Sequence, residues 1–243
     1  MAASQGRAQL LAYPTVRWLE GKAVQAVAEG EGFRIVLADG AAVHGRRLVL
    51  ATGVTDDLPA IEGLAERWGK SVFHCPYCHG YELDEGASGV IATGELAMHH
   101  ALMLPDWGTV TLFLNGAFEP DAAQLAALAS RGVALERTLV ARIEGEADVV
   151  LLDGRTLPMA GLFVMPQMRM ASPIAGQLGC AMEDGHAGQF VRTDMMKASS
   201  VAGVFCCGDM ARAAGNVALA VADGAMAGVG AHRSLIEALN VPA

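Results

Sequence analysis

The order of apolar and amphipathic segments between residues 88 and 136 restricts the fold more than any other feature. Strands are predicted at SGVIATG (88–94), VTLFL (110–114) and VALE (133–136). Helices are predicted between them at ELAMHHALML (95–104) and DAAQLAALAS (121–130), the second with Asp121 as its N-cap. Strands that alternate with helices form a parallel sheet with crossover connections. We therefore predict an α/β fold.

Further strands are predicted on both sides of this βαβαβ unit. The first seventy residues contain mostly strand patterns, and RIVLAD (34–39), a turn at Asp39-Gly40 and RRLVLATG (46–53) predict a hairpin or meander. After the unit, VVLLDGRTL (149–157) predicts a hairpin and LFVM (162–165) a closing strand. GVFCCGD (203–209) predicts a strand, followed by a long helix from Asn216, its expected cap, to Leu239.

The composition excludes several classes of protein. With 243 residues, of which 53% are hydrophobic and 18% charged, the chain is expected to be globular and to form one large domain or two modest ones. Its formal net charge of −9 argues against nucleic acid or an anionic membrane as a partner. Residues 1–25 lack a signal-peptide pattern, and the apolar tail 216–231 is too polar and too rich in small residues for a membrane span. A cytoplasmic location is expected.

The five cysteines lie at positions 75, 78, 180, 206 and 207. An odd number without a signal peptide argues against a secreted disulfide scaffold. In a reducing compartment, a C-x-x-C pair is typically redox-active or binds a metal. The stretch SVFHCPYCHGYE (71–82) contains such a pair, and three interpretations compete for it.

The first two interpretations are a zinc site and a glutaredoxin-like domain. A structural zinc needs four ligands, and His74 and His79 are too close in sequence to complete a tetrahedron with both thiols. Cys206 and Cys207 are adjacent, so their side chains are expected to diverge in a strand. C-P-Y-C is also the active tetrapeptide of glutaredoxins, but strands precede it and a βαβαβ unit follows it here, which is the wrong context. No metal site is predicted.

The third interpretation is a dithiol that exchanges electrons with a flavin. A C-x-x-C at the start of a helix is expected to have one thiol whose pKa is lowered by the helix dipole and the paired sulfur. Pro76 suits a first helical turn, where its missing N–H costs nothing. A histidine directly after the motif, His79, can move the proton that thiolate exchange requires. The alternative for His74 and His79 is that they are surface or capping residues.

Taken together, these segments resemble the thioredoxin-reductase-like pyridine nucleotide-disulfide oxidoreductases over essentially the whole chain. The branch that carries C-P-Y-C-H-G-Y-E includes bacterial flavoproteins and the dithiol oxidases of disulfide-containing natural products. FHCPYCHGYE (73–82) resembles the redox motif of this family, and GVIATGELAMHHALML (89–104) resembles the opening of its nicotinamide domain. LVLATG (48–53), LGC (178–180) and GVFCCGD (203–209) resemble its flavin-contacting segments.

The resemblance implies two Rossmann-like domains. An incomplete, discontinuous FAD-binding-type domain (1–70 and 167–243) would contain an inserted NAD(P)-binding-type domain (71–166) that carries the dithiol. Cys78 would face the flavin, Cys75 would exchange with the substrate, and His79 would be the acid/base group. Asp209 would bond the ribityl chain, and the helix from Asn216 would point its N-terminus at the flavin. The implied cofactor-binding residues are Ala51, Thr52, Gly53, Gly94, Gly208, Asp209, Asn216, Val217 and Ala218.

Two departures from the family pattern concern the cofactors. The family begins with a strand, a G-x-G-x-x-G turn and a helix that hold the ADP half of FAD, and the chain contains no G-x-G-x-x-G. The FAD site is therefore expected to be incomplete. The glycine-rich turn for the nicotinamide nucleotide is reduced to Ala92-Thr93-Gly94, and Leu114-Asn115-Gly116 stands where NADPH-dependent reductases carry arginines. Arg131 and Arg137 lie too far along the chain to replace them, so NADP or NAD is expected to bind weakly, and oxygen stays open as the electron acceptor.

The sequence thus predicts a thioredoxin-reductase-like, flavin-dependent dithiol/disulfide oxidoreductase. The alternative is a non-catalytic, flavin-deficient remnant that acts as a binding or subunit protein. The resemblance implies a homodimer and a substrate that is either a small dithiol or a thioredoxin-like protein.

Overall fold

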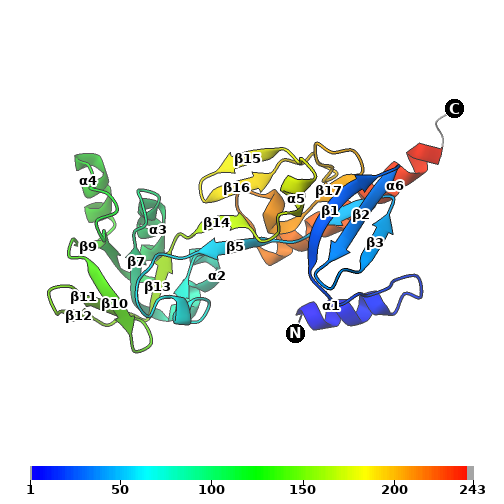
Figure 1. The fold of residues 1–243 in the computed structure, drawn as a ribbon. Helices are drawn as coiled ribbons and strands as arrows, with labels where there is room; N and C mark the ends of the chain where they lie inside the picture. The colour runs from blue at the N-terminus through cyan, green and yellow to red at the C-terminus, as the bar shows by residue number, and fades with distance from the viewer. Residues whose placement is uncertain (1, 240–243) are drawn as a thin grey trace. The chain divides into compact units, whose positions relative to one another are not determined.

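The computed structural model describes residues 2–239 and forms two compact units (Figure 1). Unit 1 comprises the chain up to Val54 and from Met170 onward, and unit 2 comprises Thr55–Arg169. The chain therefore leaves unit 1 after Val54, whereas the sequence placed this boundary after residue 70. The difference has a packing cause: Leu64 is fully buried in a cluster with Val72 and Ile91 of unit 2. The segment that follows Pro59 is thus part of the core of unit 2.

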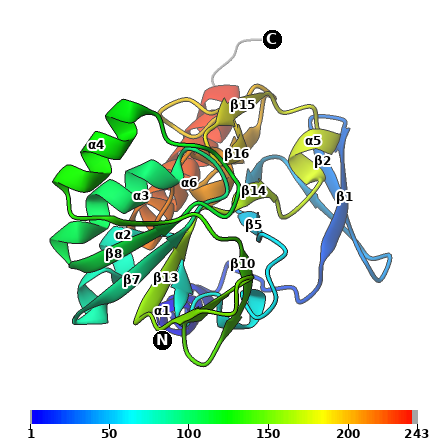
Figure 2. The same cartoon turned by 90° about the vertical axis from the view of Figure 1, so that its left-hand side faces the viewer.

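Unit 2 is built on a five-stranded parallel sheet in the order β6-β13-β7-β8-β9. This confirms the parallel α/β sheet predicted from the strand–helix alternation. Helices α3 and α4 lie together along this sheet (Figure 2), and α4 begins with the predicted Asp121 cap, whose Oδ1 accepts from the Gln124 N–H at 2.8 Å. The elements are β6 (Val72–Phe73), β7 (Glu85–Ile91), α3 (Ala97–Met103), β8 (Gly108–Phe113), α4 (Ala122–Ser130), β9 (Ala134–Glu136) and β13 (Gly161–Val164).

Alternate residues of the central strands fill two separate cores, one on each face of the sheet. Val90, Leu112 and Phe163 pack with α3 on one face. Their neighbours Ile91, Phe113 and Leu162 pack on the other face, against a small antiparallel sheet of β10 (Val140–Glu144), β11 (Asp148–Leu151) and β12 (Thr156–Leu157). Burial on both faces is the reason that these strands read as continuous apolar runs.

Unit 1 contains a three-stranded meander of β1 (Ala23–Glu29), β2 (Gly32–Leu37) and β3 (Ala42–Gly45). The prediction of a hairpin partner at 46–53 was wrong, because β3 pairs with β2 and the next strand, β4 (Leu48–Leu50), pairs in parallel with β17 (Val204–Cys206). Leu50, Val204 and Cys206 share one buried cluster, which gives β4 its distant partner. Residues 2–11, in the region expected to be mostly strands, form helix α1 (Ala2–Leu11).

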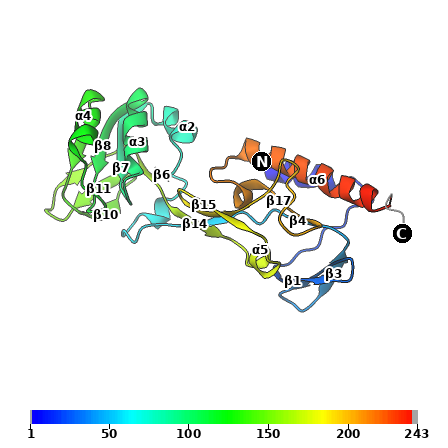
Figure 3. The ribbon, with the colours of Figure 1, turned by 90° about the horizontal axis from the view of Figure 1, so that it is seen from above.

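Helix α6 (Val217–Leu239) lies along β17 and β4 in unit 1 (Figure 3). The predicted cap is confirmed, because Asn216 Oδ1 accepts from the Leu219 N–H at 2.9 Å. Gly230 is the point of closest packing: a Cβ there would lie 2.5 Å from the Met196 carbonyl and 2.9 Å from the Phe205 ring. Within residues 2–239, no helix has both the length and the apolarity that a membrane crossing requires. The other elements of the fold are β5 (Val54–Asp57), which pairs with β14 (Gln167–Met170), the hairpin of β15 (Met182–Gly185) and β16 (Gly188–Val191), and α5 (Ile174–Gln177).

Candidate functional site

The two thiols of the C-x-x-C motif are in contact at the start of a short helix in unit 2. Cys75 is the N-cap of α2 (Pro76–His79), and buried Pro76 occupies the first helical position, as predicted. The Sγ atoms of Cys75 and Cys78 lie 2.7 Å apart. Cys75 is half-buried and Cys78 is exposed. This arrangement places a dithiol within reach of a disulfide bond, with one sulfur open to solvent.

The protonation of Cys78 is set mainly by the neighbouring sulfur of Cys75. The hydrogen bond with Cys75 raises the pKa of Cys78 to about 11, with smaller effects from burial and from the negative charges of Cys75 and Glu82. The thiol with a lowered pKa that the sequence predicts is therefore not Cys78. Cys78 therefore keeps its proton at neutral pH while it is hydrogen-bonded to Cys75.

His79 is held by two contacts. Its ring stacks on Phe73, with the ring centroids 4.1 Å apart and the planes at 19°. Its Nδ1 lies 3.3 Å from Oε2 of Glu82. Sequence reasoning named His79 but missed both of these neighbours, although Glu82 stands three residues later in the same motif. His74, in contrast, is exposed, and its ring lies 6.4 Å from that of Trp68.

Aromatic side chains surround the dithiol. Tyr77, between the two cysteines, is 76% exposed and meets Trp107 edge-on, with the centroids 5.6 Å apart. Trp107 also explains the glycine of the motif, since a Cβ on Gly80 would lie 2.9 Å from its ring. Tyr81, in the 3₁₀ helix η2 (Tyr81–Leu83), is 85% exposed. The motif thus presents two aromatic rings to solvent beside its thiols.

In unit 1, the predicted flavin-contacting residues gather where β4 and β17 end. Ala51 and Thr52 are exposed, and both the N–H and the hydroxyl of Thr52 contact Sδ of Met210, at 3.4 and 3.3 Å. β17, the partner strand of β4, is followed by η4 (Gly208–Ala211), where Gly208 has a φ of +72°. Ligands of open α/β sheets bind at the carboxyl ends of their strands, so this is the expected position for a cofactor.

Asp209 has an unpartnered atom at this position. Its Oδ1 is buried and has no hydrogen-bond partner among the described residues. Gly215 lies directly against this oxygen, and a Cβ there would collide with it. A buried carboxylate oxygen without a donor is costly, and a hydroxyl of a bound ligand would satisfy it.

The N-terminus of α6 offers further donors. Asn216 uses its Oδ1 to cap the helix, so this side-chain oxygen is not available to a ligand. The backbone N–H groups of Val217 and Ala218 make no hydrogen bond to other described residues, and Val217 is 76% exposed. The first N–H groups of a helix attract anions and carbonyl oxygens. Among the described residues, Val217 and Ala218 therefore present free N–H groups at the helix start, which Asn216 caps.

A buried ion cluster, which sequence reasoning missed, ties these segments together. Asp223 of α6 is 2% exposed and accepts from Arg212 Nε and Nη2, both at 2.7 Å. Lys197, whose φ is +64°, brings its Nζ within 2.9 Å of Oδ1 of the same carboxylate. Arg212 and Lys197 lower the pKa of Asp223 to about 2. The cluster joins the residue after η4, the start of α6 and the loop before β17.

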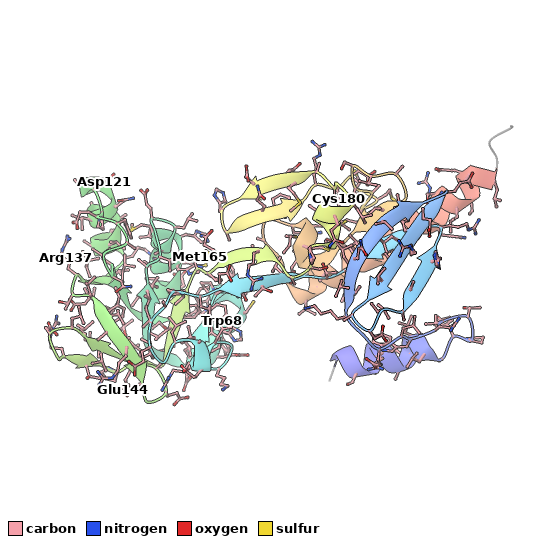
Figure 4. All side chains as sticks on the ribbon, in the orientation of Figure 1. Trp68, Asp121, Arg137, Glu144, Met165 and Cys180 are labelled. Carbon is pink, nitrogen blue, oxygen red and sulfur yellow. The ribbon has the colours of Figure 1, made fainter. Side chains whose placement is uncertain are left out.

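Some of the residues near the expected nicotinamide-nucleotide site form hydrogen bonds or ion pairs with other residues of the protein instead. Gly94 lies at the end of β7 with open space around it, and the neighbouring Thr93 hydroxyl donates to the Met165 carbonyl at 2.8 Å. Asn115 has a φ of +48° and accepts from the Val140 N–H at 3.0 Å. The two arginines after these turns form ion pairs, Arg131 with Asp106 at 2.7 Å and Arg137, labelled in Figure 4, with Glu119. Both arginines thus already share their charge with a carboxylate.

The remaining cysteines are buried in unit 1. Cys180, labelled in Figure 4, and Cys206 share one hydrophobic cluster, whereas Cys207 belongs to another, which confirms that the adjacent cysteines diverge. A hydrogen bond from Cys206 lowers the pKa of Cys180 to about 6. Among the residues that the structure describes, no three His, Cys, Asp or Glu side chains are grouped as metal ligands.

The predicted site residues thus form two sets, one in each unit. Unit 2 holds Cys75, Cys78 and His79, which lie together, and Gly94 at the end of β7. Unit 1 holds the implied flavin-binding residues, which lie at the ends of β4 and β17 and at the start of α6. Unit 2 thus holds two thiols in contact, and unit 1 holds a strand-end position with an unpartnered carboxylate oxygen.

Comparison with known proteins identifies the family. The family model described as pyridine nucleotide-disulphide oxidoreductase matches residues 6–227. Thioredoxin reductase tcpT of Claviceps purpurea (strain 20.1) is 33% identical over 94% of this chain and 75% of its own length. The crystal structure of an oxidoreductase from Agrobacterium tumefaciens is 53% identical, covers 97% of this chain and 80% of its own, and superposes with a TM-score of 0.93. The crystal structure of HlmI is 33% identical over 97% of this chain and 76% of its own, with a TM-score of 0.87. The chain therefore belongs to the pyridine nucleotide-disulphide oxidoreductase family and is thioredoxin-reductase-like within it.

Proposed function

We propose that the chain exchanges electrons between a flavin and a substrate dithiol or disulfide through Cys75 and Cys78. The observation that carries this proposal is the contact between the two sulfurs, 2.7 Å apart at the start of α2, beside a histidine whose ring is held by Phe73 and Glu82. Cys75 is the thiol that exchanges with substrate, Cys78 is the thiol that faces the flavin, and His79 is the acid/base group.

The raised pKa of Cys78 supports an ordered reaction on a substrate disulfide. Cys75 attacks as a thiolate, one substrate sulfur leaves, and His79 gives that sulfur its proton. Cys78, whose pKa is raised to about 11 while it is hydrogen-bonded to the Cys75 sulfur, keeps its proton during this first step. It then loses this proton to His79 and attacks Cys75, which forms the Cys75–Cys78 disulfide and releases the second substrate sulfur. Run backwards, the same steps oxidise a substrate dithiol.

The residues of unit 1 fit the isoalloxazine and ribityl part of FAD. Asp209 would accept a ribityl hydroxyl on its unpartnered Oδ1, and the N–H groups of Val217 and Ala218 would face the ring. Ala51, Thr52, Gly53 and Gly208 would line the strand ends beside it. When bound, the flavin would supply the two-electron acceptor or donor that returns the dithiol to its starting state after each exchange. The residues for the ADP half are not found in this sequence, so the proposed FAD site is incomplete.

Two substrate classes remain for the proposed reaction, a small dithiol and a thioredoxin-like protein. The exposed rings of Tyr77 and Tyr81 offer contact surface to either class. The relative from Claviceps purpurea carries the name thioredoxin reductase, which supports the protein substrate. A cytoplasmic homodimer is part of the proposal.

The dithiol is expected to cycle between two thiols and one disulfide without a metal. Oxidation with a small disulfide should remove two accessible thiols per chain, and reduction should restore them. Cys75→Ser and Cys78→Ser should each abolish this change, while Cys207→Ser, which removes a buried cysteine of unit 1, should leave it intact. Thiol titration and zinc analysis of the purified protein provide the measurements. Stoichiometric zinc, or thiols that never oxidise, would contradict the proposal.

NADPH is not expected to be preferred strongly over NADH, and both should bind weakly. Selection of the 2′-phosphate usually depends on a free guanidinium that binds it with two hydrogen bonds. Arg131 and Arg137 instead form ion pairs with carboxylates. Direct titration of both nucleotides should give dissociation constants within about tenfold of each other, which is about 1.4 kcal/mol. A larger preference for NADPH would reveal a phosphate site elsewhere in unit 2.

A further inference from the structure

Glu82 stands beside the proposed acid/base group but has no role in the reaction as described so far. It lies in η2, three residues after His79, and its Oε2 is 3.3 Å from His79 Nδ1. The second contact of His79 is with Phe73, on which the imidazole stacks with the ring centroids 4.1 Å apart. Stacking on Phe73 fixes the plane of the His79 ring. The carboxylate beside one ring nitrogen then fixes which of the two flipped orientations the ring adopts within that plane. Together the two contacts specify both the position and the orientation of the imidazole.

The carboxylate also distinguishes between the two neutral forms of histidine. A neutral imidazole carries one proton, and the nitrogen that donates a hydrogen bond to a carboxylate keeps it. A proton on Nδ1 leaves Nε2 as the acceptor. We propose that Glu82 is a positioning residue, which holds His79 in the Nδ1–H form so that Nε2 is the atom that exchanges protons with Cys75 and Cys78.

This role differs from a contribution to stability. The side chain of Glu82 is 72% exposed and that of His79 is 37% exposed. Ion pairs as exposed as this one contribute little to folding. Removal of the carboxylate should therefore leave the fold intact and change the state of the imidazole, which makes the two roles separable by experiment.

Glu82 has a second effect of opposite sign on the reaction. Its negative charge is one of the causes that raise the pKa of Cys78. Loss of the charge should make the Cys78 thiolate easier to form, whereas loss of the hydrogen bond should release His79. Glu82→Gln removes the charge but keeps an oxygen that can accept from Nδ1–H. Glu82→Ala removes both, so the comparison of the two variants isolates the positioning role.

The inference rests on the proposed role of His79, but its first test needs no activity. The full chain, labelled with ¹⁵N-histidine and reduced, is studied by NMR at a pH where imidazoles are neutral, and the His79 signals are assigned by their loss in His79→Gln. The wild type and Glu82→Gln should show the proton of His79 on Nδ1. Glu82→Ala should shift it toward Nε2. A proton on Nε2 in the wild type, or an unchanged Nδ1–H form in Glu82→Ala, would overturn the inference.

Glu66→Ala is the matched control. Glu66 is an exposed glutamate at the middle of another three-residue 3₁₀ helix of unit 2, η1 (Ala65–Arg67), and its replacement should leave the His79 signals unchanged. The same change in this control would also overturn the inference, because the effect would not be specific to Glu82.

The rate at which the reduced chain reduces a small aromatic disulfide provides the second test. Glu82→Ala should slow this reaction about tenfold, because the misplaced imidazole would lose a part of the rate enhancement that a general base provides. Glu82→Gln should restore most of the rate, and Glu82→Ala should have no further effect in a His79→Gln background. If His79→Gln leaves the rate unchanged while the NMR result holds, the proposed acid/base role of His79 fails and the positioning by Glu82 stands. A tenfold loss that persists in the His79→Gln background would show that Glu82 does not act through His79.

Discussion

Replacement of Asp223 by alanine is expected to destabilise unit 1 by about 3 kcal/mol, because it leaves two cations without their shared carboxylate. Asp223 is 2% exposed, accepts two hydrogen bonds from Arg212 and forms an ion pair with Lys197. The loss should lie at the low end of the values for buried pairs, since the Arg212 side chain is 28% exposed and keeps contact with water.

The pH dependence of this contribution has a definite sign. The pKa of Asp223 is lowered by Arg212 and Lys197 from its ordinary value of 3.8 to about 2 in the folded protein. A group whose folded pKa is lowered stabilises the protein above its unfolded pKa and loses this effect as the pH falls through the folded pKa. The stabilisation by Asp223 should therefore be complete above a pH of about 5 and decline between about 4 and 2.

Urea unfolding measures the change in the free energy of unfolding caused by Asp223→Ala. Hydrogen exchange of separate peptides then assigns this change to one unit or the other. Peptides from β17 and α6 should lose protection in Asp223→Ala, while those from β7 and β8 of unit 2 should not. Glu237→Ala is the matched control, because Glu237 lies on the same helix in an exposed pair with Arg233 at 3.4 Å. Its cost should be below about 0.5 kcal/mol. A loss of less than about 1 kcal/mol in Asp223→Ala would mean that the buried cluster contributes as little as a surface pair.

The polypeptide of residues 1–243, expressed by itself, is expected to purify with little or no FAD. In the proposed site, Asp209, Val217 and Ala218 would contact only the ribityl and ring portions of the flavin. No G-x-G-x-x-G is present to place backbone N–H groups and a helix N-terminus at the pyrophosphate. The charge-assisted hydrogen bonds that are missing contribute roughly 1.5–3 kcal/mol each. Exposed apolar residues of β4 and α6, such as Val49 and Val221, should also favour self-association.

The visible spectrum of the purified protein and titrations with FAD and riboflavin test this prediction. The two flavins should bind with affinities within about tenfold of each other, because the polypeptide contacts the part that they share. Asp209→Ala should weaken both to a similar extent, by about 1 kcal/mol or more. A yellow, monomeric protein with stoichiometric FAD would refute the prediction and would favour a working oxidoreductase. Failure to bind either flavin would instead favour the non-catalytic alternative.

Features that depend on neighbours in the chain were predictable from the sequence. The strand–helix order of residues 88–136 gave the parallel sheet, because hydrophobic periodicity is a local property. Asp121 and Asn216 were recognised as helix caps because a cap bonds to a backbone N–H three residues away. The dithiol on a helix start followed from Cys75-Pro76 for the same reason.

Features that depend on distant partners were decided by the tertiary structure. β4 was assigned to the wrong partner because its true partner is distant in the sequence. The Leu50 carbonyl accepts from the Cys207 N–H, 157 residues away, and Leu50 shares a core with Cys206. The unit boundary moved because Leu64 is buried against β6 and β7.

The chemistry of the site divides in the same way. The sequence by itself determined which candidate site residues are present, namely the two thiols and His79 of unit 2 and Asp209 of unit 1. Protonation was decided by three-dimensional neighbours. The sulfur of Cys75 raises the pKa of Cys78, and in the buried ion cluster Arg212 and Lys197 lower the pKa of Asp223. A pKa responds to charge and burial within a few ångströms in space, and a linear pattern records neither of these.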